Sequence, residues 1–423
     1  MALTKTPECG YKFYPKPNYP DVPFAELDAR ITKVQQLMAE NNIECLVLWS
    51  DPNVRYFFGF ESIHWRAASI QPAVGIIPNK GEPVLIMPEF FRGSAECQCW
   101  TRNILGQEDI HQPKAQRELP VEVANVIKEL GYASKNIGLE MGPMGCMYIP
   151  RPLNDIKAFE GALGDAKFVD GDAVIWGCRM IKSPLEITRI RTAVNALAAI
   201  EAALVEEYRP GMTEIDLSII VQRKAAELGN GYLGASIGLQ GSFRAALNKE
   251  PMADIGVHEG ATIGKGDYIF FDMDYSYKGY NPDSARIFQI GPVTKRMMEL
   301  YELVWACEDK AEAILKPGIK ANELWQEMYD PIRAAGLPVL DMGGHGKGLG
   351  LEPPSIDAWC EIPIEEGMVL SIEPWVYEHF KMKGGDGKFG IQDQFAVTKK
   401  GCEKIEGLRR DIVQVSHPIL EKV

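Results

Sequence analysis

The chain is poor in histidine and has no long apolar run. Only six of its 423 residues are histidine, which limits the positions where an imidazole could act as a ligand or proton carrier. No run reaches the roughly 18 apolar residues of a membrane span, and the first residues lack the apolar core of a signal peptide. We therefore expect neither a membrane span nor a secretory leader.

Basic residues are also in short supply. There are 45 Lys and Arg against 58 Asp and Glu, giving a formal charge of -13. This balance argues against nucleic acid and anionic membranes as partners. The nine cysteines are odd in number, and the close pair Cys97 and Cys99 matches neither a redox nor a zinc motif. We expect a reduced, cytoplasmic protein.

The length predicts about two domains. Helical and strand-like patterns alternate in the first part, which favours an α/β domain over residues 1–175. The patterns are a helix over 23–42, strands over 44–50, 72–78 and 83–88, a helix over 121–132 and a strand over 136–141. The stretch 168–184 runs from a strand into Ser183, a helix N-cap, and Pro184, a first helical residue. A second domain over 176–423 follows.

The second domain contains a faint internal repeat. Helical patterns over 212–229 and 319–336 each follow a Pro-Gly pair, and strands led by Gly266 and Gly367 come later in each half. A helix followed by a strand, twice at nearly one period, predicts an α+β domain with pseudo-twofold symmetry. The meeting point of its halves is the favoured place for a site.

Acidic residues gather in a predicted hairpin over 268–289. With the polar turn near Lys278 and Gly279 centred at 277–278, Asp272 and Asp283 would face each other, and Asp274 would share the face of Asp272. Two unpaired carboxylates at that distance repel, and a divalent cation would remove the conflict. The alternative is a solvated hairpin in which Arg286 neutralises Asp283.

Three later positions carry further metal-ligand chemistry. His345 lies in a predicted glycine-rich loop, Glu373 ends the apolar strand 368–375, and Gln392 with Asp393 interrupts the strand 389–398. Each has an ordinary alternative: a loop histidine, a salt-bridged glutamate and an edge-strand pair.

In this order, the residues resemble the metal ligands of the methionine aminopeptidase, prolidase and creatinase superfamily. The 11-residue spacing of Asp272 and Asp283, the GHG at 344–346, the EGMVLSIEP at 366–374 and the RMIKSPLEI at 179–187 carry the resemblance. It implies a pita-bread catalytic domain, which is α+β with pseudo-twofold symmetry, after a smaller α/β creatinase/prolidase-type N-domain. It also implies a divalent metal (Fe, Mn, Zn or Co). The implied ligands are Asp272, Asp283, His345, Glu373 and the position of Gln392, with Asp274 and Asp393 as possible additions.

The sequence departs from this superfamily at the last ligand. The position that normally holds a Glu bridging two metals is Gln392, which is neutral and a poorer bridge. The five-position set then has three carboxylates, too few for two divalent ions unless Asp274 or Asp393 joins. We predict one tightly bound metal or weakly loaded sites.

Two histidines of the superfamily's peptidases are also missing. No histidine follows the GHG within 349–354, and Asn248 stands near the position of the other, with His258 as a possible substitute. We therefore expect a hydrolase that is not a standard Xaa-Pro peptidase. It would cleave a C–N bond in a small polar or zwitterionic amino-acid derivative, as creatinase and ectoine hydrolase do. Glu352, with a raised pKa, would carry the proton beside His345 and His258.

Other functions remain open. Asp272 with Asp274, Glu352, and Asp393 with Gln394 resemble dimethylsulfoniopropionate lyase, which implies proton abstraction beside a carboxylate. An Xaa-Pro dipeptidase or a non-catalytic binding member are further alternatives. The resemblance also implies a homodimer in which an N-domain loop reaches the partner's active site. Substrate would then meet His64, Trp65 and Arg66 of that loop, together with Tyr275 and Asn248.

Overall fold

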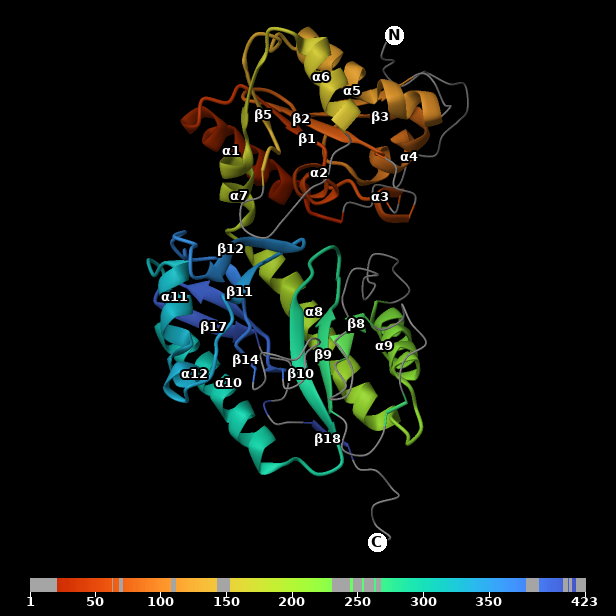
Figure 1. The fold of residues 1–423 in the computed structure, drawn as a ribbon. Helices are drawn as coiled ribbons and strands as arrows, with labels where there is room; N and C mark the ends of the chain where they lie inside the picture. The colour runs from red at the N-terminus through yellow and green to blue at the C-terminus, as the bar shows by residue number, and fades with distance from the viewer. Residues whose placement is uncertain are drawn as a thin grey trace. The chain divides into compact units, whose positions relative to one another are not determined.

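The computed structural model describes most of the chain and divides it into two compact units, Met1–Arg179 and Met180–Val423 (Figure 1). The described residues are 21–62, 64–67, 71–107, 112–142, 153–229, 244–245, 253–254, 262–263, 268–377, 388–405, 410 and 413–415. In this part of the chain, no helix is long and apolar enough to cross a membrane.

The first unit is built on a six-stranded mixed sheet in the order β4-β3-β2-β1-β5-β6. The strands are β1 (Cys45–Leu48), β2 (Val74–Pro78), β3 (Val84–Pro88), β4 (Ile104–Gln107), β5 (Asn136–Leu139) and β6 (Lys167–Asp170). The helices are α1 (Phe24–Glu40), α2 (Asp51–Phe58), α3 (His64–Ala67), α4 (Glu89–Gln98), α5 (Gln112–Glu129), α6 (Leu153–Leu163) and α7 (Asp172–Arg179). The expected α/β alternation is present in this unit.

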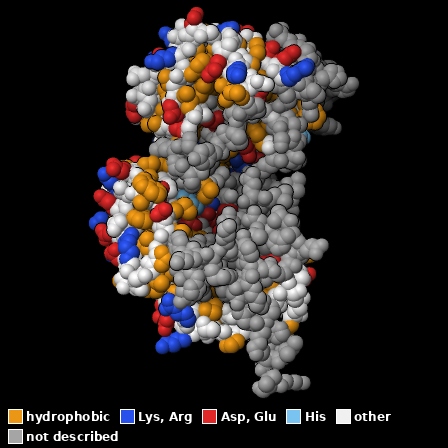
Figure 2. Space-filling model, viewed as in Figure 1, with side chains coloured by type: hydrophobic (Ala, Val, Ile, Leu, Met, Phe, Trp, Pro, Cys, Tyr) orange, Lys and Arg blue, Asp and Glu red, His pale blue; other side chains and the backbone are white. Residues whose placement is uncertain are grey.

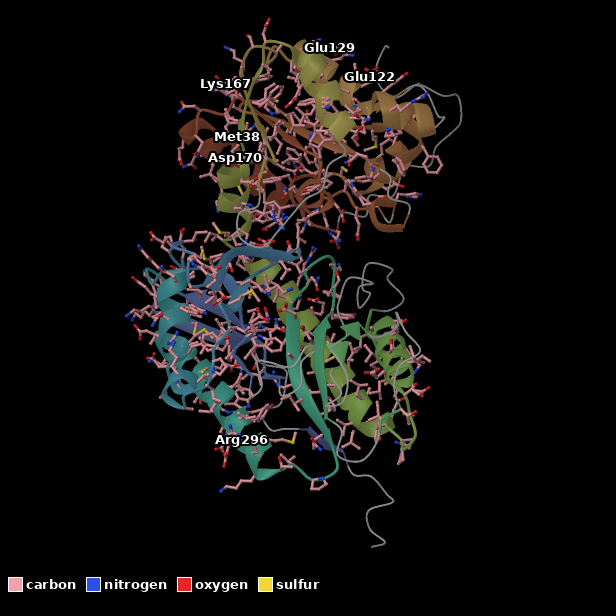
Figure 3. All side chains as sticks on the ribbon, in the orientation of Figure 1. Met38, Glu122, Glu129, Lys167, Asp170 and Arg296 are labelled. Atoms are coloured by element: carbon pink, nitrogen blue, oxygen red, sulfur yellow. The ribbon has the colours of Figure 1, made fainter. Side chains whose placement is uncertain are left out.

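Amphipathic patterning explains how α1 packs. Leu27, Ile31, Val34 and Met38 recur at helical spacing and are all buried, so one stripe of the helix faces the core (Figure 3 labels Met38). The predicted helix over 23–42 is thus observed almost in full.

The sequence after β6 was predicted less well. Residues 172–179 form α7, although their apolar run reads as the continuation of a strand. Asp170 ends the strand, and its Oδ1 accepts a hydrogen bond from the backbone N–H of Asp172 at the start of the helix. This local side-chain contact favours a helix start over a further strand residue.

The second unit combines a five-stranded and a three-stranded sheet. The first has the order β12-β11-β13-β16-β17 and the second the order β18-β10-β9. Their strands are β9 (Tyr268–Asp274), β10 (Asp283–Ile290), β11 (Met342–Lys347), β12 (Leu351–Asp357), β13 (Val369–Ile372), β16 (Asp393–Thr398), β17 (Gly401–Ile405) and β18 (Val413–Val415). Two short pairs are formed by β7 (Arg244–Ala245) with β8 (Ala253–Asp254) and by β14 (Trp375–Tyr377) with β15 (Lys388–Gly390).

Among the described residues of this unit, five helices accompany these sheets (Figure 1). They are α8 (Pro184–Glu207), α9 (Glu214–Leu228), α10 (Lys295–Ile314), α11 (Ala321–Met328) and α12 (Asp330–Ala334). Ser183 caps α8 in a reciprocal capping box with Glu186, as its place before Pro184 predicts. The single helix expected over 319–336 is instead two, because Pro331 has no N–H with which to continue α11.

Charges on the described surface are mixed. Figure 2 shows Asp and Glu side chains interspersed with Lys and Arg on the visible face of both units. The acidic net charge therefore does not decide the function, and the chemistry has to be read from the buried polar residues of the second unit.

Candidate metal centre

The acidic hairpin forms, but its turn lies one residue later than expected, so the two strands pair in a different register. Asp283 lies directly opposite Asp274, and Asp272 lies opposite Ala285. The chain turns through Lys278 and Gly279, whose φ angles are 50° and 84°. Because opposed residues, and residues two apart on one strand, share a face, all three aspartates project from the same side of the hairpin.

His345 lies in strand β11, between β12 and β13, and not in the loop that we predicted. The neighbouring glycines allow these strands to come close together. A Cβ on Gly344 would lie 2.1 Å from the carbonyl oxygen of Ser371, and one on Gly346 would lie 2.2 Å from that of Pro353. Close strand packing thus requires the glycines of the GHG motif, and the motif places His345 on an interior strand of the sheet.

The imidazole of His345 lies between two carboxylates. Its Nε2 is 3.5 Å from Oδ2 of Asp283 and 3.4 Å from Oε1 of Glu373. Its Nδ1 lies 3.1 Å from the carbonyl oxygen of Gly346, which can only accept, so the proton of the neutral ring belongs on Nδ1. The lone pair of Nε2 then faces two anionic oxygens, an arrangement that calls for a cation.

The charge states of this cluster follow from burial and from neighbouring groups. Burial lowers the pKa of His345 below its ordinary value, and the nearby Lys347 acts in the same direction. Burial alone would raise the pKa of Asp283, but Lys347 and His345 hold it below its ordinary value. A neutral imidazole beside ionised carboxylates is the donor set that divalent transition metals prefer.

Lys347 is a site residue that the sequence reasoning missed. It is two residues after His345 on β11, and its Nζ lies 2.9 Å from Oδ2 of Asp283 and 3.1 Å from Oδ1 of Asp274. These two carboxylates hold the pKa of Lys347 above its ordinary value, although burial alone would lower it. The sequence offers one signal that could have found it. If residues 342–347 are predicted to be a strand, His345 and Lys347 are two residues apart and share one face.

Glu373 and Gln392 meet at the edge of the same cluster. Glu373 falls between β13 and β14, and Gln392 comes just before β16, so the two predicted strands are each interrupted at the candidate ligand. The side-chain amide of Gln392 donates to Oε2 of Glu373 at 3.1 Å. Among the described residues, the buried Oε1 of Gln392 accepts no hydrogen bond, so it is an oxygen suited to a cation.

Asp393 belongs to a different cluster. Arg286 donates to both of its carboxylate oxygens, at 2.8 and 2.9 Å, and Lys404 lies 2.8 Å from Oδ2. Glu308 completes the group through Lys404, and all four side chains are largely or fully buried. Arg286 therefore neutralises Asp393, not Asp283, and the expectation that Asp393 supplements the metal ligands finds no support.

Glu352 is held by another buried cation. Its Oε2 lies 2.8 Å from Nζ of Lys182, and its Oε1 accepts the backbone N–H of Leu349 at 3.0 Å. Both carboxylate oxygens are thus engaged by donors of the protein itself. The structure therefore gives Glu352 a bracing role between the start of α8 and strand β12.

The remaining candidates are scattered or lie outside the described residues. Tyr275 is buried, and its hydroxyl donates to the carbonyl oxygen of Ala225 at 3.5 Å, as expected of a packing residue. His64 and Trp65 lie in α3, where they pack against Phe91 and Phe60. Arg66 is in the same helix, but its side chain is outside the described part, as are Asn248 and His258.

The described residues do not by themselves close around a metal ion. Among them, no group of three or more His, Cys, Asp or Glu side chains is arranged to hold one. The chemistry of Asp283, His345 and Glu373 nevertheless suits a divalent ion, because Nε2 lies about one ligand-to-ligand distance from an oxygen on either side. These three side chains and the Oε1 of Gln392 fit one cation better than two.

Comparisons with known proteins agree on the family of both halves. The sequence matches Metallopeptidase family M24 over residues 188–399 and the Creatinase/Prolidase N-terminal domain over residues 30–181. It is 26% identical to a Xaa-Pro dipeptidase of Pyrococcus horikoshii, over 92% of this chain and 99% of that protein. A Xaa-Pro dipeptidase of Lactobacillus delbrueckii is 25% identical, over 88% of this chain and 95% of that protein.

Solved structures show the same two-part fold. The prolidase from Pyrococcus horikoshii superposes with a TM-score of 0.73, at 23% identity and with 91% and 100% of the two chains covered. The N-terminal domain of the chickpea FACT complex subunit SPT16 has a TM-score of 0.68 at 13% identity, with 94% and 100% covered, and shows the fold alone. The expected pita-bread domain after a creatinase/prolidase-type N-domain is confirmed.

The expected function, in contrast, is wrong. We excluded a standard Xaa-Pro peptidase because two short histidine motifs are missing, yet relatives aligned over most of the chain are named Xaa-Pro dipeptidases. The exclusion relied on a few positions, and the stretch meant to supply one histidine, around Asn248 and His258, lies outside the described residues. The likeness to dimethylsulfoniopropionate lyase receives no support from these comparisons.

Proposed function

Because the chain belongs to metallopeptidase family M24 and is a hydrolase of the creatinase and prolidase superfamily, we propose that it is a dipeptidase acting on Xaa-Pro substrates. The reaction is hydrolysis of the peptide bond that precedes proline. The observation that supports it most is the buried contact of His345 with both Asp283 and Glu373. These three residues follow one another along the chain in the same order as the metal ligands of a superfamily of metal-dependent hydrolases.

Members of this family use divalent metals. In our proposal Asp283, His345 and Glu373 hold the ion, with Asp272 and the Oε1 of Gln392 as further oxygens. The bound ion would supply Lewis-acid chemistry, polarising the scissile carbonyl and lowering the pKa of a water molecule. Zn, Mn, Fe and Co all suit such a mixed nitrogen and oxygen set.

The protein's own contribution is to fix the ligands before substrate arrives. The Nδ1 contact of His345 with Gly346 orients the ring so that Nε2 faces the carboxylates. Gln392 fixes Glu373 through Oε2, and Gln394 donates to Oδ1 of Asp283 at 3.1 Å and to the hydroxyl of Ser371 at 3.0 Å. Ligands held by such outer contacts need little rearrangement on binding.

A substrate panel tests the proposal. Purified full-length chain is incubated with Mn²⁺, Co²⁺ or Zn²⁺ and Ala-Pro, Gly-Pro, Ala-Leu and Ala-Pro-Ala, and free amino acids are measured. We expect proline to be released from the two Xaa-Pro dipeptides and slower or no cleavage of the other two peptides. Faster cleavage of a creatine-, ectoine- or sulfonio-type compound than of every Xaa-Pro dipeptide would reject this assignment.

We also propose that the enzyme is a homodimer and that it acts in the cytoplasm. We propose that the α3 segment of one copy contributes to the site of the other. The partly exposed His64 and Trp65 of that helix support it, together with the 60% exposed Phe90 beside His64. Mixing a Trp65→Ala variant with a His345→Ala variant should restore activity if the site is shared, whereas a mixture as inactive as its parts would reject it.

A further inference from the structure

Lys347 occupies the position where a cation is most needed in the acidic hairpin. Asp274 and Asp283 are directly opposed across β9 and β10, and carboxylates so placed repel each other. The Nζ of Lys347 contacts both, at 3.1 and 2.9 Å, and the residue is only 1% exposed. The conflict that a metal ion would relieve is relieved here by an ammonium group.

A buried lysine in this place has a large effect on any metal that binds beside it. Asp283 Oδ2 is the atom that faces both Lys347 and His345, so the ammonium already uses one of the directions from which this oxygen can bind a cation. A second divalent ion next to Asp283 would lie within a few ångströms of Lys347 and would be repelled in a site largely closed to water.

Gln392 acts in the same direction as Lys347. Its neutral amide replaces a carboxylate and donates to Glu373, so the cluster has one fewer negative charge and one occupied carboxylate oxygen. Counting Asp272, Asp274, Asp283 and Glu373 as -4 and Lys347 as +1 gives -3. One divalent ion brings the sum to -1, whereas two would make this buried site positive.

We propose that the ammonium of Lys347, together with the amide of Gln392, replaces one of two metal ions, so that this chain holds a single divalent ion beside His345. The inference rests on the metal requirement of the proposed function. Its test needs no peptide, so a failed peptidase assay and a failed metal count are distinct results.

Metal content and spectrum provide the test. The full chain is loaded with Mn²⁺, dialysed against metal-free buffer, and examined by elemental analysis and electron paramagnetic resonance. We expect one equivalent and the spectrum of an isolated ion. Two retained equivalents with the spectrum of a coupled pair would overturn the proposal, and so would no retained metal in folded protein.

Variants test the part played by Lys347. The double variant Lys347→Met/Gln392→Glu should gain a second equivalent and a coupled-pair spectrum, whereas Gln392→Glu alone should stay at one because the ammonium remains. Lys320→Met, which removes an exposed lysine paired with Glu361, is the control and should also stay at one. A folded double variant that stays at one equivalent would overturn the role of Lys347. If circular dichroism shows that the double variant does not fold, the Gln392→Glu result decides, since two equivalents there would reject the proposal.

Discussion

The ammonium nitrogen of Lys182 lies 2.8 Å from Oε2 of Glu352, and both side chains are almost fully buried. Lys182 also donates to the carbonyl oxygen of Met180 at 3.1 Å. This contact joins the residues before α8 to strand β12, the neighbour of the strand that carries His345. It links a sequence motif shared with the superfamily to the position of the candidate metal centre.

Breaking this ion pair should destabilise the second unit strongly. Lys182→Met leaves the Glu352 carboxylate buried without its cation, which typically costs about 3–5 kcal/mol. Chemical denaturation followed by circular dichroism measures the loss. The double variant Lys182→Met/Glu352→Gln should recover part of the stability, because no unpaired charge remains.

The matched control for that prediction is an exposed ion pair. Arg191→Met removes the surface contact with Glu403 and should cost less than about 1 kcal/mol. Equal losses from Lys182→Met and Arg191→Met would show that the buried pair has no special role.

A methyl group at Gly346 should also disturb the site. Its Cβ would lie 2.2 Å from the carbonyl oxygen of Pro353, so strands β11 and β12 would have to separate. We expect Gly346→Ala to lose about 1–3 kcal/mol of stability and to weaken metal retention. Gly93→Ala in α4, where a Cβ would meet no atom within 4 Å, should be neutral or slightly stabilising. Unchanged stability of Gly346→Ala would contradict the packing explanation of the GHG motif.

The stability of the first unit should fall as pH rises through the acidic range. Burial, followed by the charges of Asp170 and Glu140, raises the pKa of Asp172 to about 7. An acid whose folded-state pKa is raised binds more protons when folded, so stability declines between about pH 4 and pH 7. Asp172→Asn should flatten this decline in denaturation curves. The control Asp28→Asn, at an exposed position, should leave the decline unchanged. A wild-type stability that rises steadily over this range, or the same decline in Asp172→Asn, would contradict the prediction.

The fold was more predictable from sequence than the detailed site. Helical spacing in α1 and the Ser183-Pro184 signal of α8 are local properties, so periodicity and capping chemistry were enough to find them. The register of the acidic hairpin was missed by one residue pair, because the positive φ angles at Lys278 and Gly279 set the turn and the sequence does not specify them uniquely.

The part played by Lys347 could not be predicted for a related reason. The glycine-rich pattern around Lys347 predicts a loop, whereas close pairing with β12 and β13 makes residues 342–347 an interior strand. Asp393 shows the same limit, since only the fold brings Arg286 and Lys404 to its carboxylate. Identity of a side chain is local, but its partner is decided by the tertiary structure.

The most direct test of the account is metal-dependent release of proline from a Xaa-Pro dipeptide by wild type, His345→Ala and the control Lys320→Met. We predict that a chelator abolishes wild-type activity, that a divalent ion restores it, and that Lys320→Met behaves as wild type. His345→Ala should lose about 100-fold or more of the activity while remaining folded. Activity of His345→Ala equal to wild type, or no proline release by folded wild type with any of Mn²⁺, Co²⁺, Zn²⁺ and Fe²⁺, would contradict the account.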